Sequence, residues 1–253
     1  MHFHSQGIIL KNLDYQEADK LVTIFTVVRG KTQALARGIK KPGSSLRPLV
    51  QPFCHVHLYL ARGRSLDILA QGRMINFYGN IRQDLSRTMQ ALYIMELLDK
   101  ALLDQVPLTN LFNTTIEVLL NLDEEGSHPL LLRYFELRLL IELGYAPVLS
   151  HCVMCHSIAI ADGFFKLSEG GLLCASCAQK EGGCIRLKPD NLALLRLMQN
   201  AGLQIVKRVR ITRSSLEQLE RFLEQYLEYY LERRFVMKNT IRVLKQKFII
   251  TEP

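Results

Sequence analysis

Four cysteines arranged in two Cys-x-x-Cys pairs are the residues of this chain with the clearest chemical meaning. Cys152 and Cys155 form the first pair, Cys174 and Cys177 form the second, and 18 residues separate the two pairs. This spacing is typical of a four-cysteine zinc site. Each pair lets two thiolates reach one ion from a tight turn, and two pairs complete a closed tetrahedron with no position left for water. The spacing therefore predicts a structural zinc site rather than a catalytic one.

The same residues allow other interpretations. Free buried thiols or a disulfide are alternatives to zinc, and a cytosolic setting disfavours the disulfide. Cys152, Cys155 and His156 also spell the Cys-x-x-Cys-His pattern of haem attachment. That attachment normally follows export, and haem would leave the second pair unexplained, so we reject it. Replacement of one cysteine ligand by His151 or His156 stays open.

Other motifs give no positive sign of catalysis. Residues 30–32 (GKT) are similar to the end of a phosphate-binding P-loop, but that motif requires a glycine where this chain has Phe25. His55, His57 and Tyr59 share one face of an expected strand, yet no carboxylate lies nearby in sequence, and we interpret them as structural. No Ser-His-Asp, Cys-His or paired-carboxylate arrangement stands out. The sequence predicts a protein that is not an enzyme and binds no nucleotide triphosphate.

Positive charge is concentrated in the first third of the chain. The net charge is +8, and residues 1–80 hold eleven Lys and Arg against four Asp and Glu. The segment from Lys20 to Leu66 contains no acidic residue. A segment of one sign attracts polyanions such as nucleic acids. A solvated basic face that keeps the protein soluble is the alternative.

The elements that must position these residues begin with short strands. Strands are expected at 7–13, 21–28, 31–38, 51–60 and 65–77, with the last bent or bulged at Gly72. Together they predict an antiparallel barrel. Because strand side chains alternate, Lys31 and Arg37 lie on one face of the third strand. The turn-rich loop that follows adds Lys40 and Lys41 beside that face.

Helices replace strands after a boundary near Gly79. The apolar period changes there from two toward 3.6 residues. Apolar stripes predict helices around 85–102, 109–122, 130–141 and 216–230, and we expect all of them to pack in the core. Ser214 and Glu217 have the spacing of a capping box at the start of the last helix. The isolated Cys54 and Cys184 are expected to be small core residues.

Composition limits the class of protein. The chain has 253 residues, of which 48% are apolar and 22% are charged, as in a globular protein. No apolar run approaches the roughly 20 residues that a membrane helix needs. The first 20 residues lack the basic and apolar regions of a secretory signal. We therefore expect a cytoplasmic protein with no membrane segment.

The order of several short motifs is similar to that of one bacterial family. They are residues 7–11 (GIILK), 14–21 (DYQEADKL), 36–41 (ARGIKK), 49–53 (LVQPF) and 143–147 (LGYAP), followed by the two cysteine pairs. The chain resembles the RecO recombination mediators along its whole length. The resemblance implies an α+β fold, in which an N-terminal OB-fold barrel (residues 1–79) precedes a helical domain (80–253). A four-cysteine zinc ribbon at about 148–186 is inserted in that helical domain.

The resemblance also implies partners and a function. An OB-fold binds single strands along a cationic groove. The candidate DNA-binding cations are Arg29, Lys31, Arg37, Lys40, Lys41, Arg47 and Arg64. The aromatic candidates for base stacking are Tyr15, Phe25, Phe53 and Tyr59. Arg133 and Arg138 are weaker candidates for the rim of a pocket that takes the acidic C-terminal tail of single-strand DNA-binding protein.

The implied function is DNA repair in the nucleoid. The protein would bind single- and double-stranded DNA, anneal strands coated with single-strand DNA-binding protein, and help load RecA together with RecR, without ATP. Two other classes of function stay open. One is an interaction scaffold whose basic face docks acidic partners, and the other is a metal-dependent nuclease.

Overall fold

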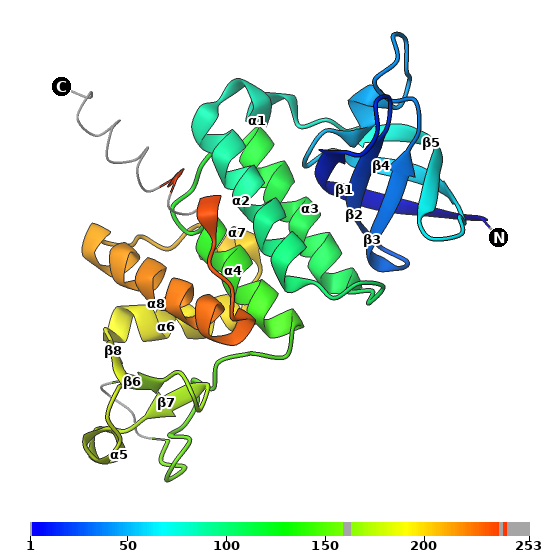
Figure 1. The fold of residues 1–253 in the computed structure, drawn as a ribbon. Coiled ribbons are helices and arrows are strands. Elements are labelled where there is room, and N and C mark those ends of the chain that lie inside the picture. Colours follow the sequence, from blue (N-terminus) through cyan, green and yellow to red (C-terminus); the bar gives the residue numbers. More distant parts are fainter. Residues whose placement is uncertain (1, 159–162, 238–239, 242–253) are drawn as a thin grey trace. The chain divides into compact units, whose positions relative to one another are not determined.

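The computed structural model describes residues 2–158, 163–237 and 240–241 of the chain (Figure 1). These residues form two compact units. The first holds residues up to 127 together with those from Phe235 onward, and the second runs from His128 to Arg234. No helix within the described ranges is long and apolar enough to cross a bilayer.

Five strands of the first unit close into a barrel (Figure 1). They are β1 (His2–Asp14), β2 (Lys20–Thr26), β3 (Gly30–Ala36), β4 (His55–Ala61) and β5 (Asp67–Asn76). Their order is β1-β2-β3-β5-β4, and β1 pairs with both β2 and β4 to close the barrel. The pairing of β3 with β5 is parallel, whereas all other pairings are antiparallel. The predicted five-stranded barrel is confirmed, with one parallel pairing that alternation along single strands does not reveal.

Alternate residues of each strand fill the barrel, as the period of two predicts. Val22 and Ile24 of β2 and Val56, Leu58 and Leu60 of β4 are fully buried in one apolar cluster. The 3₁₀ helix η1 (Arg47–Val50) adds two further apolar side chains, Leu49 and Val50, to the same cluster. The barrel core therefore extends into the connection between β3 and β4.

The expected bulge at Gly72 is wrong. Gly72 pairs regularly with Leu58, and the irregularities of the β4–β5 register lie on either side, between Tyr59 and Leu60 and between His55 and Val56. A Cβ at Gly72 would meet the Leu49 side chain at 3.0 Å and the His57 carbonyl at 3.2 Å. The glycine is there because another part of the chain approaches the strand closely.

Three helices pack on the barrel within the first unit. They are α1 (Gly79–Gln83), α2 (Leu85–Ala101) and α3 (Thr109–Glu124). The Phe25 ring of β2 meets the Phe112 ring of α3 edge-on at 5.5 Å. Lys11 of β1 pairs with Asp99 of α2 at 2.6 Å. The compact unit therefore continues past Gly79, where the sequence period changes.

The second unit is helical and carries a small sheet. Its helices are α4 (Leu131–Glu142), α5 (Ala175–Lys180), α6 (Pro189–Asn200), α7 (Leu203–Val206) and α8 (Arg213–Leu231). Strands β6 (Gly163–Lys166), β7 (Gly171–Leu173) and β8 (Ile185–Leu187) form a sheet in the order β7-β6-β8. Helix α4 packs against both α6 and α8. The expected insertion of a ribbon between helices is confirmed.

Helix α8 begins at a different cap from the one that the sequence suggested. Thr212 has an extended backbone, and its hydroxyl accepts a hydrogen bond from the Ser215 amide at 3.2 Å. Ser214 is already inside the helix, and Glu217 pairs with Arg213 at 3.1 Å. The predicted capping box of Ser214 and Glu217 is therefore wrong, because Thr212 binds the free amide first.

The two isolated cysteines differ. Cys54 is fully buried in the barrel core, as expected, where burial raises the pKa of its thiol. Cys184 is half-buried, and its thiol donates to the Glu181 carbonyl at 3.8 Å. The expectation that Cys184 is a core residue is wrong.

Candidate functional site

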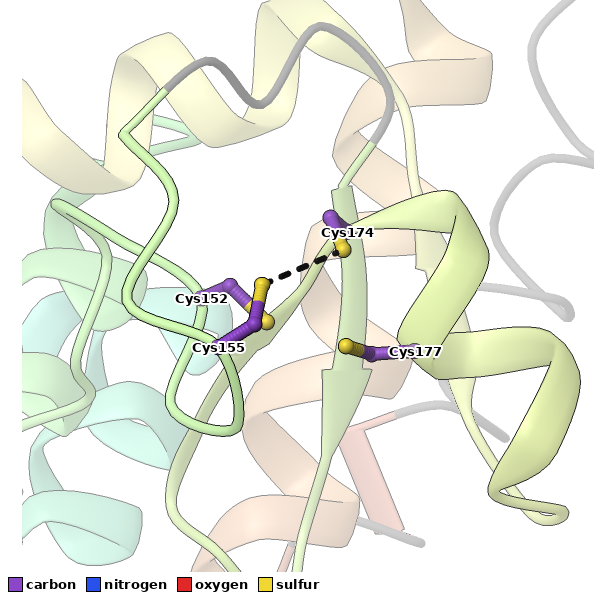
Figure 2. Close-up of side chains that lie close together, drawn as sticks. All are labelled: Cys152, Cys155, Cys174 and Cys177. Carbon is purple, nitrogen blue, oxygen red and sulfur yellow. Dashed lines mark hydrogen bonds between the residues drawn. The ribbon is translucent and has the colours of Figure 1, made fainter.

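The four paired cysteines meet at one point of the ribbon. Figure 2 shows Cys152, Cys155, Cys174 and Cys177 with their sulfur atoms directed toward one another. All four sulfurs lie within 4.8 Å of one another, and those of Cys155 and Cys174 are 3.7 Å apart. Zinc–sulfur bonds of about 2.3 Å in a tetrahedron require sulfur separations of about 3.8 Å. The donor set and its size therefore fit a closed zinc site.

Strand β7 brings the two pairs together. The Val153 amide in the first pair donates to the Leu172 carbonyl of β7 at 2.8 Å. The second pair follows β7 directly, since Cys174 comes after Leu173 and caps helix α5. Each pair also has its own turn, because the His156 amide donates to the Cys152 carbonyl at 2.9 Å and Ala178 does the same to Cys174.

Neighbouring groups shift the pKa values of these thiols in different directions. The Ser176 hydroxyl, followed by contacts from Cys177, lowers the pKa of Cys174 to about 6. The hydrogen bond with Cys174 raises the pKa of Cys177 to about 12. Burial opposes ionisation of Cys152, but the surrounding backbone amides hold its pKa below the ordinary value. Ser176 and the backbone amides therefore favour the thiolate form of Cys174 and Cys152, which is the form that binds a metal.

The two histidines beside the first pair are not part of the cluster. Within the described ranges, the four cysteines are the one group of at least three metal-binding side chains that converge. The His151 ring lies against the Ser150 hydroxyl at 2.9 Å, and its centroid is 5.7 Å from that of the His156 ring, to which it is tilted. The geometry favours four cysteine ligands over a set that includes a histidine.

The candidate cations of the barrel fall at two opposite ends. Asp14 pairs with Lys20 and Lys20 with Ala36, so the end of β1, the start of β2 and the end of β3 meet at one end. Four candidates lie at that end, which we call the basic end: Arg37, Lys40, Lys41 and Arg47. Lys20, which the sequence did not single out, lies there too and lines a hollow of about 250 Å³ with Lys40 and Arg47.

Arg47 holds the loop that presents the lysines. Its guanidinium donates to the carbonyls of Ile39, Lys40 and Lys41, at 3.3, 2.7 and 3.1 Å. These contacts occupy much of its hydrogen-bonding capacity. Arg47 therefore acts at this site mainly by fixing the backbone of residues 39–41.

Asp14 is an anion in the middle of the basic end. Its carboxylate lies 3.1 Å from the Lys40 ammonium and 3.6 Å from that of Lys20. The hydrogen bond with Lys40 holds the pKa of Asp14 below its ordinary value, although the carboxyl is fully exposed. By contrast, Lys41 and Arg37 are exposed and have no ion pair within 4 Å among the described residues.

The remaining barrel candidates have other surroundings. Arg29 lies at the opposite end, where it pairs with Asp67 at 3.1 Å and covers the Phe3 ring. Arg64 is exposed in the connection from β4 to β5. Lys31 is largely buried, donates to the Asp99 carbonyl at 2.9 Å, and lies 3.4 Å from Asp104. Lys31 thus contacts the helical part of the unit and offers little to a ligand.

The aromatic candidates divide by exposure. Phe25 and Phe53 are buried, with 0% and 2% of their surfaces exposed. Tyr15 is exposed in the connection between β1 and β2. Tyr59 is half-buried on the outer surface of β4. Only Tyr15 and Tyr59 of the four can meet a ligand.

Neither arginine proposed for a partner pocket is freely exposed. Arg133 is 4% exposed and donates to Glu136 at 2.8 Å, and it also approaches Glu220 of α8 at 3.6 Å. Arg138 is half-buried and donates to the Gln199 carbonyl of α6 at 3.3 Å. Arg133 joins α4 to α8 and offers no surface to a partner, so we do not carry its assignment forward.

Comparisons with known proteins match the whole chain. The family described as "Recombination protein O N terminal" matches residues 1–78, and "Recombination protein O C terminal" matches residues 82–238. A DNA repair protein RecO of Syntrophomonas wolfei is 48% identical over 97% of this chain and 98% of its own. Those of Desulforamulus reducens and Bacillus subtilis are each 34% identical, over 90% and 87% of this chain and 89% and 86% of their own.

The N-terminal match agrees with the barrel of the first unit. The N-terminal match covers the barrel, which is the OB-fold of this family. The names describe recombination and DNA repair, and this agrees with the prediction of a mediator rather than an enzyme. The chain belongs to the RecO family of DNA repair proteins.

Proposed function

We propose that this protein is a recombination mediator that binds single- and double-stranded DNA and anneals complementary strands without ATP. The observation that carries the proposal is the basic end of an OB-fold in a chain of this family. Lys41 and Arg37 are exposed there, beside Lys20 and Lys40. An acid-free segment supplies all four cations.

Charge neutralisation explains how such a surface would promote pairing. Two DNA strands repel each other through their phosphates, and a protein that contacts the phosphates releases bound counterions. A surface that binds both strands therefore lowers their repulsion without reading their sequence. Pairing itself then supplies the free energy, so no nucleotide triphosphate is needed.

The cysteine cluster supports a structural role for zinc. A closed set of four thiolates leaves no position for water or substrate, so the ion would stabilise the ribbon and carry no chemistry. We propose residues 148–186 as this ribbon, within a helical domain that runs from residue 80, where the family boundary and the change of period coincide.

The partners and the cellular place rest on the family. We propose that the protein acts in the cytoplasm at the nucleoid with RecR, and that it binds the acidic tail of single-strand DNA-binding protein and helps RecA load. Arg138 is the remaining candidate for the tail from the sequence, because it keeps some exposed surface.

A salt titration of DNA binding tests the proposal. The double variant Lys40→Ala with Lys41→Ala should bind a single-stranded oligonucleotide more weakly, whatever the base sequence of the oligonucleotide. Its slope of log affinity against log salt should fall in magnitude by up to about 1.4, because each lost phosphate contact with a single strand removes about 0.7. Fluorescence anisotropy of a labelled oligonucleotide measures both quantities.

The matched control removes the same charge elsewhere. Lys180 and Arg221 are exposed on helices α5 and α8, and their double alanine variant should keep the wild-type slope. Equal slopes for all three proteins would remove the basic end from DNA binding. A wild-type protein that ignores oligonucleotides at low salt would instead favour the interaction scaffold.

A further inference from the structure

Four aromatic rings lie together on the outer surface of strands β1 and β4. We call them the ring platform: His2, His4, His57 and Tyr59. The strand register places His4 directly opposite Tyr59. The Tyr59 ring is 4.6 Å from that of His4 and 5.3 Å from that of His2, on which it stacks, and His57 follows at 6.3 Å from His4.

The ring platform faces away from the barrel core. Val56, Leu58 and Leu60 alternate with its β4 members and are fully buried. His2 and His4 are exposed, and His57 and Tyr59 are half-buried. Helix α3 contacts this side of the unit further along, where Phe112 meets His55 at 5.9 Å. The platform rings therefore keep open faces, whereas His55 does not.

The ring platform is not arranged as a metal site. Its histidines do not bring three ligand atoms within 4.8 Å, a condition that the paired cysteines alone meet among the described residues. No carboxylate belongs to the platform. What it offers a ligand is a row of flat π-surfaces.

Cations flank this row of rings. Arg73 of β5 lies opposite His57 in the strand register, and Arg62 and Arg64 are exposed just beyond the end of β4. Asp67, at the start of β5, is paired with Arg29 at 3.1 Å. Stacked aromatic rings beside arginines form the surface that unpaired bases and their phosphates recognise.

We propose that the ring platform stacks the bases of single-stranded DNA, and that it is a second contact surface of the OB-fold. This inference rests on the proposed DNA-binding function. It adds which part of the DNA, the phosphates or the bases, each surface contacts. The platform lies toward the end of the barrel opposite the basic end, since His2 pairs with Ala61 and Asp14 with Lys20. The basic end contacts phosphates and the platform contacts bases.

The chain contains no tryptophan, so one introduced at the ring platform is a unique reporter. Tyr59→Trp should lose a large part of its emission when oligo-dT saturates the protein, because a stacked base quenches the indole. His4→Trp reports on the same surface from an exposed position that cannot disturb the core. Tyr229→Trp places the reporter on an exposed residue of the second unit and should keep its emission.

Loss of the rings should separate stacking from charge. The variant His4→Ser with Tyr59→Ser should bind oligo-dT about tenfold more weakly, in line with the usual contribution of a stacked base. Its salt slope should not change, because every lysine and arginine is kept. Affinity for a duplex should also be unchanged, since duplex bases are already stacked on each other.

The outcomes distinguish this inference from the function on which it rests. If the Tyr59→Trp and His4→Trp proteins bind oligo-dT with a steep salt slope and yet keep constant emission, base stacking on the ring platform is refuted. That result would leave DNA binding intact. If oligo-dT quenches Tyr59→Trp and His4→Trp no more than it quenches Tyr229→Trp, base stacking on the ring platform is also refuted. Absence of any binding by the wild-type protein would overturn both proposals.

Discussion

Asp14 lies at the basic end beside lysines that the proposed function assigns to DNA phosphates. Its carboxylate contacts Lys20 and Lys40 in the protein without DNA. A phosphate must therefore displace or rearrange this anion before both lysines can bind it. We therefore expect Asp14 to weaken DNA binding at the proposed site.

The variant Asp14→Asn should bind single-stranded DNA several-fold more tightly at low salt. The amide keeps the size of the side chain but removes the charge that competes with the phosphate. The salt slope should become steeper, because both lysines then release counterions from the DNA. Glu17→Gln, an exposed change in the same connection, is the control. An equal gain in both variants would show that only net charge matters.

His55 makes the first unit sensitive to acid. Burial lowers the pKa of His55 from 6.5 to about 4, because the charged ring would lose its water beside Phe112. The unfolded chain then binds more protons than the folded one between these values. The free energy of unfolding should therefore fall as the pH drops from about 6.5 to about 4, by about 3 kcal/mol at most.

Denaturant unfolding at a series of pH values measures this loss. The variant His55→Gln cannot titrate and keeps a polar group for Gln6, whose amide oxygen lies 3.1 Å from the His55 ring. The free energy of unfolding of the wild type minus that of the variant should be constant above pH 7 and should fall as the pH drops toward 4. A difference that stays the same at all pH values would contradict the buried neutral histidine.

At the residue scale, the sequence located the charges but not their surroundings. Lys40 and Lys41 follow a strand and lie in an acid-free segment, and both are on the surface as predicted. Lys31 belongs to the same segment but is held by Asp99 and Asp104, which lie far away in the sequence. Alternation along β3 places Lys31 on the outer face without showing that helices cover this part of it.

The ribbon is tied to the helices of the second unit by aromatic packing. Phe165 of β6 meets the rings of Phe222 and Tyr226 in α8 edge-on, at 4.9 and 5.2 Å. The Tyr230 hydroxyl donates to the Leu167 carbonyl at 3.1 Å, just after β6. Loss of order in the ribbon therefore removes contacts from α8.

Removal of zinc by a strong chelator should lower the melting temperature of the protein by several degrees. The free energy of binding the proposed zinc would stabilise the folded ribbon, and α8 would share that stability through its contact with Phe165. DNA binding by the barrel should persist. Atomic emission should find one zinc per chain in the wild type and in Cys184→Ser, but none in Cys174→Ser. Chelation that selectively abolished DNA binding would contradict a purely structural ion.

At the element scale, periodicity predicted the five barrel strands and helices α2, α3, α4 and α8, but not the helices α1, α5, α6 and α7. The single-residue features were less predictable, because each depends on a neighbour in space. Helix α8 is capped by Thr212 instead of Ser214. Gly72 makes room for Leu49 and forms no bulge. Helix α2 buries a wide face that includes Tyr93 and Leu97, because it packs against β1 as well as α1 and α3.

The whole molecule combines a basic barrel with a helical unit that carries the ribbon. The order of these parts could be predicted because the apolar period changes at Gly79 and the cysteine spacing is specific. The packing of α1, α2 and α3 on the barrel could not, since it depends on contacts such as Phe25 with Phe112. The ring platform was also missed, because only the pairing of β1 with β4 joins its halves.

An annealing assay is the most direct test of whether this protein pairs complementary strands by neutralising their phosphates. Two complementary labelled oligonucleotides, each coated with single-strand DNA-binding protein, are mixed with this protein without ATP, and duplex formation is followed over a salt series. If the basic end neutralises phosphates, annealing should be faster at low salt, and the acceleration should fade as salt rises. The Lys40→Ala, Lys41→Ala variant should accelerate annealing less. A protein that binds each strand but accelerates annealing at no salt concentration would contradict it.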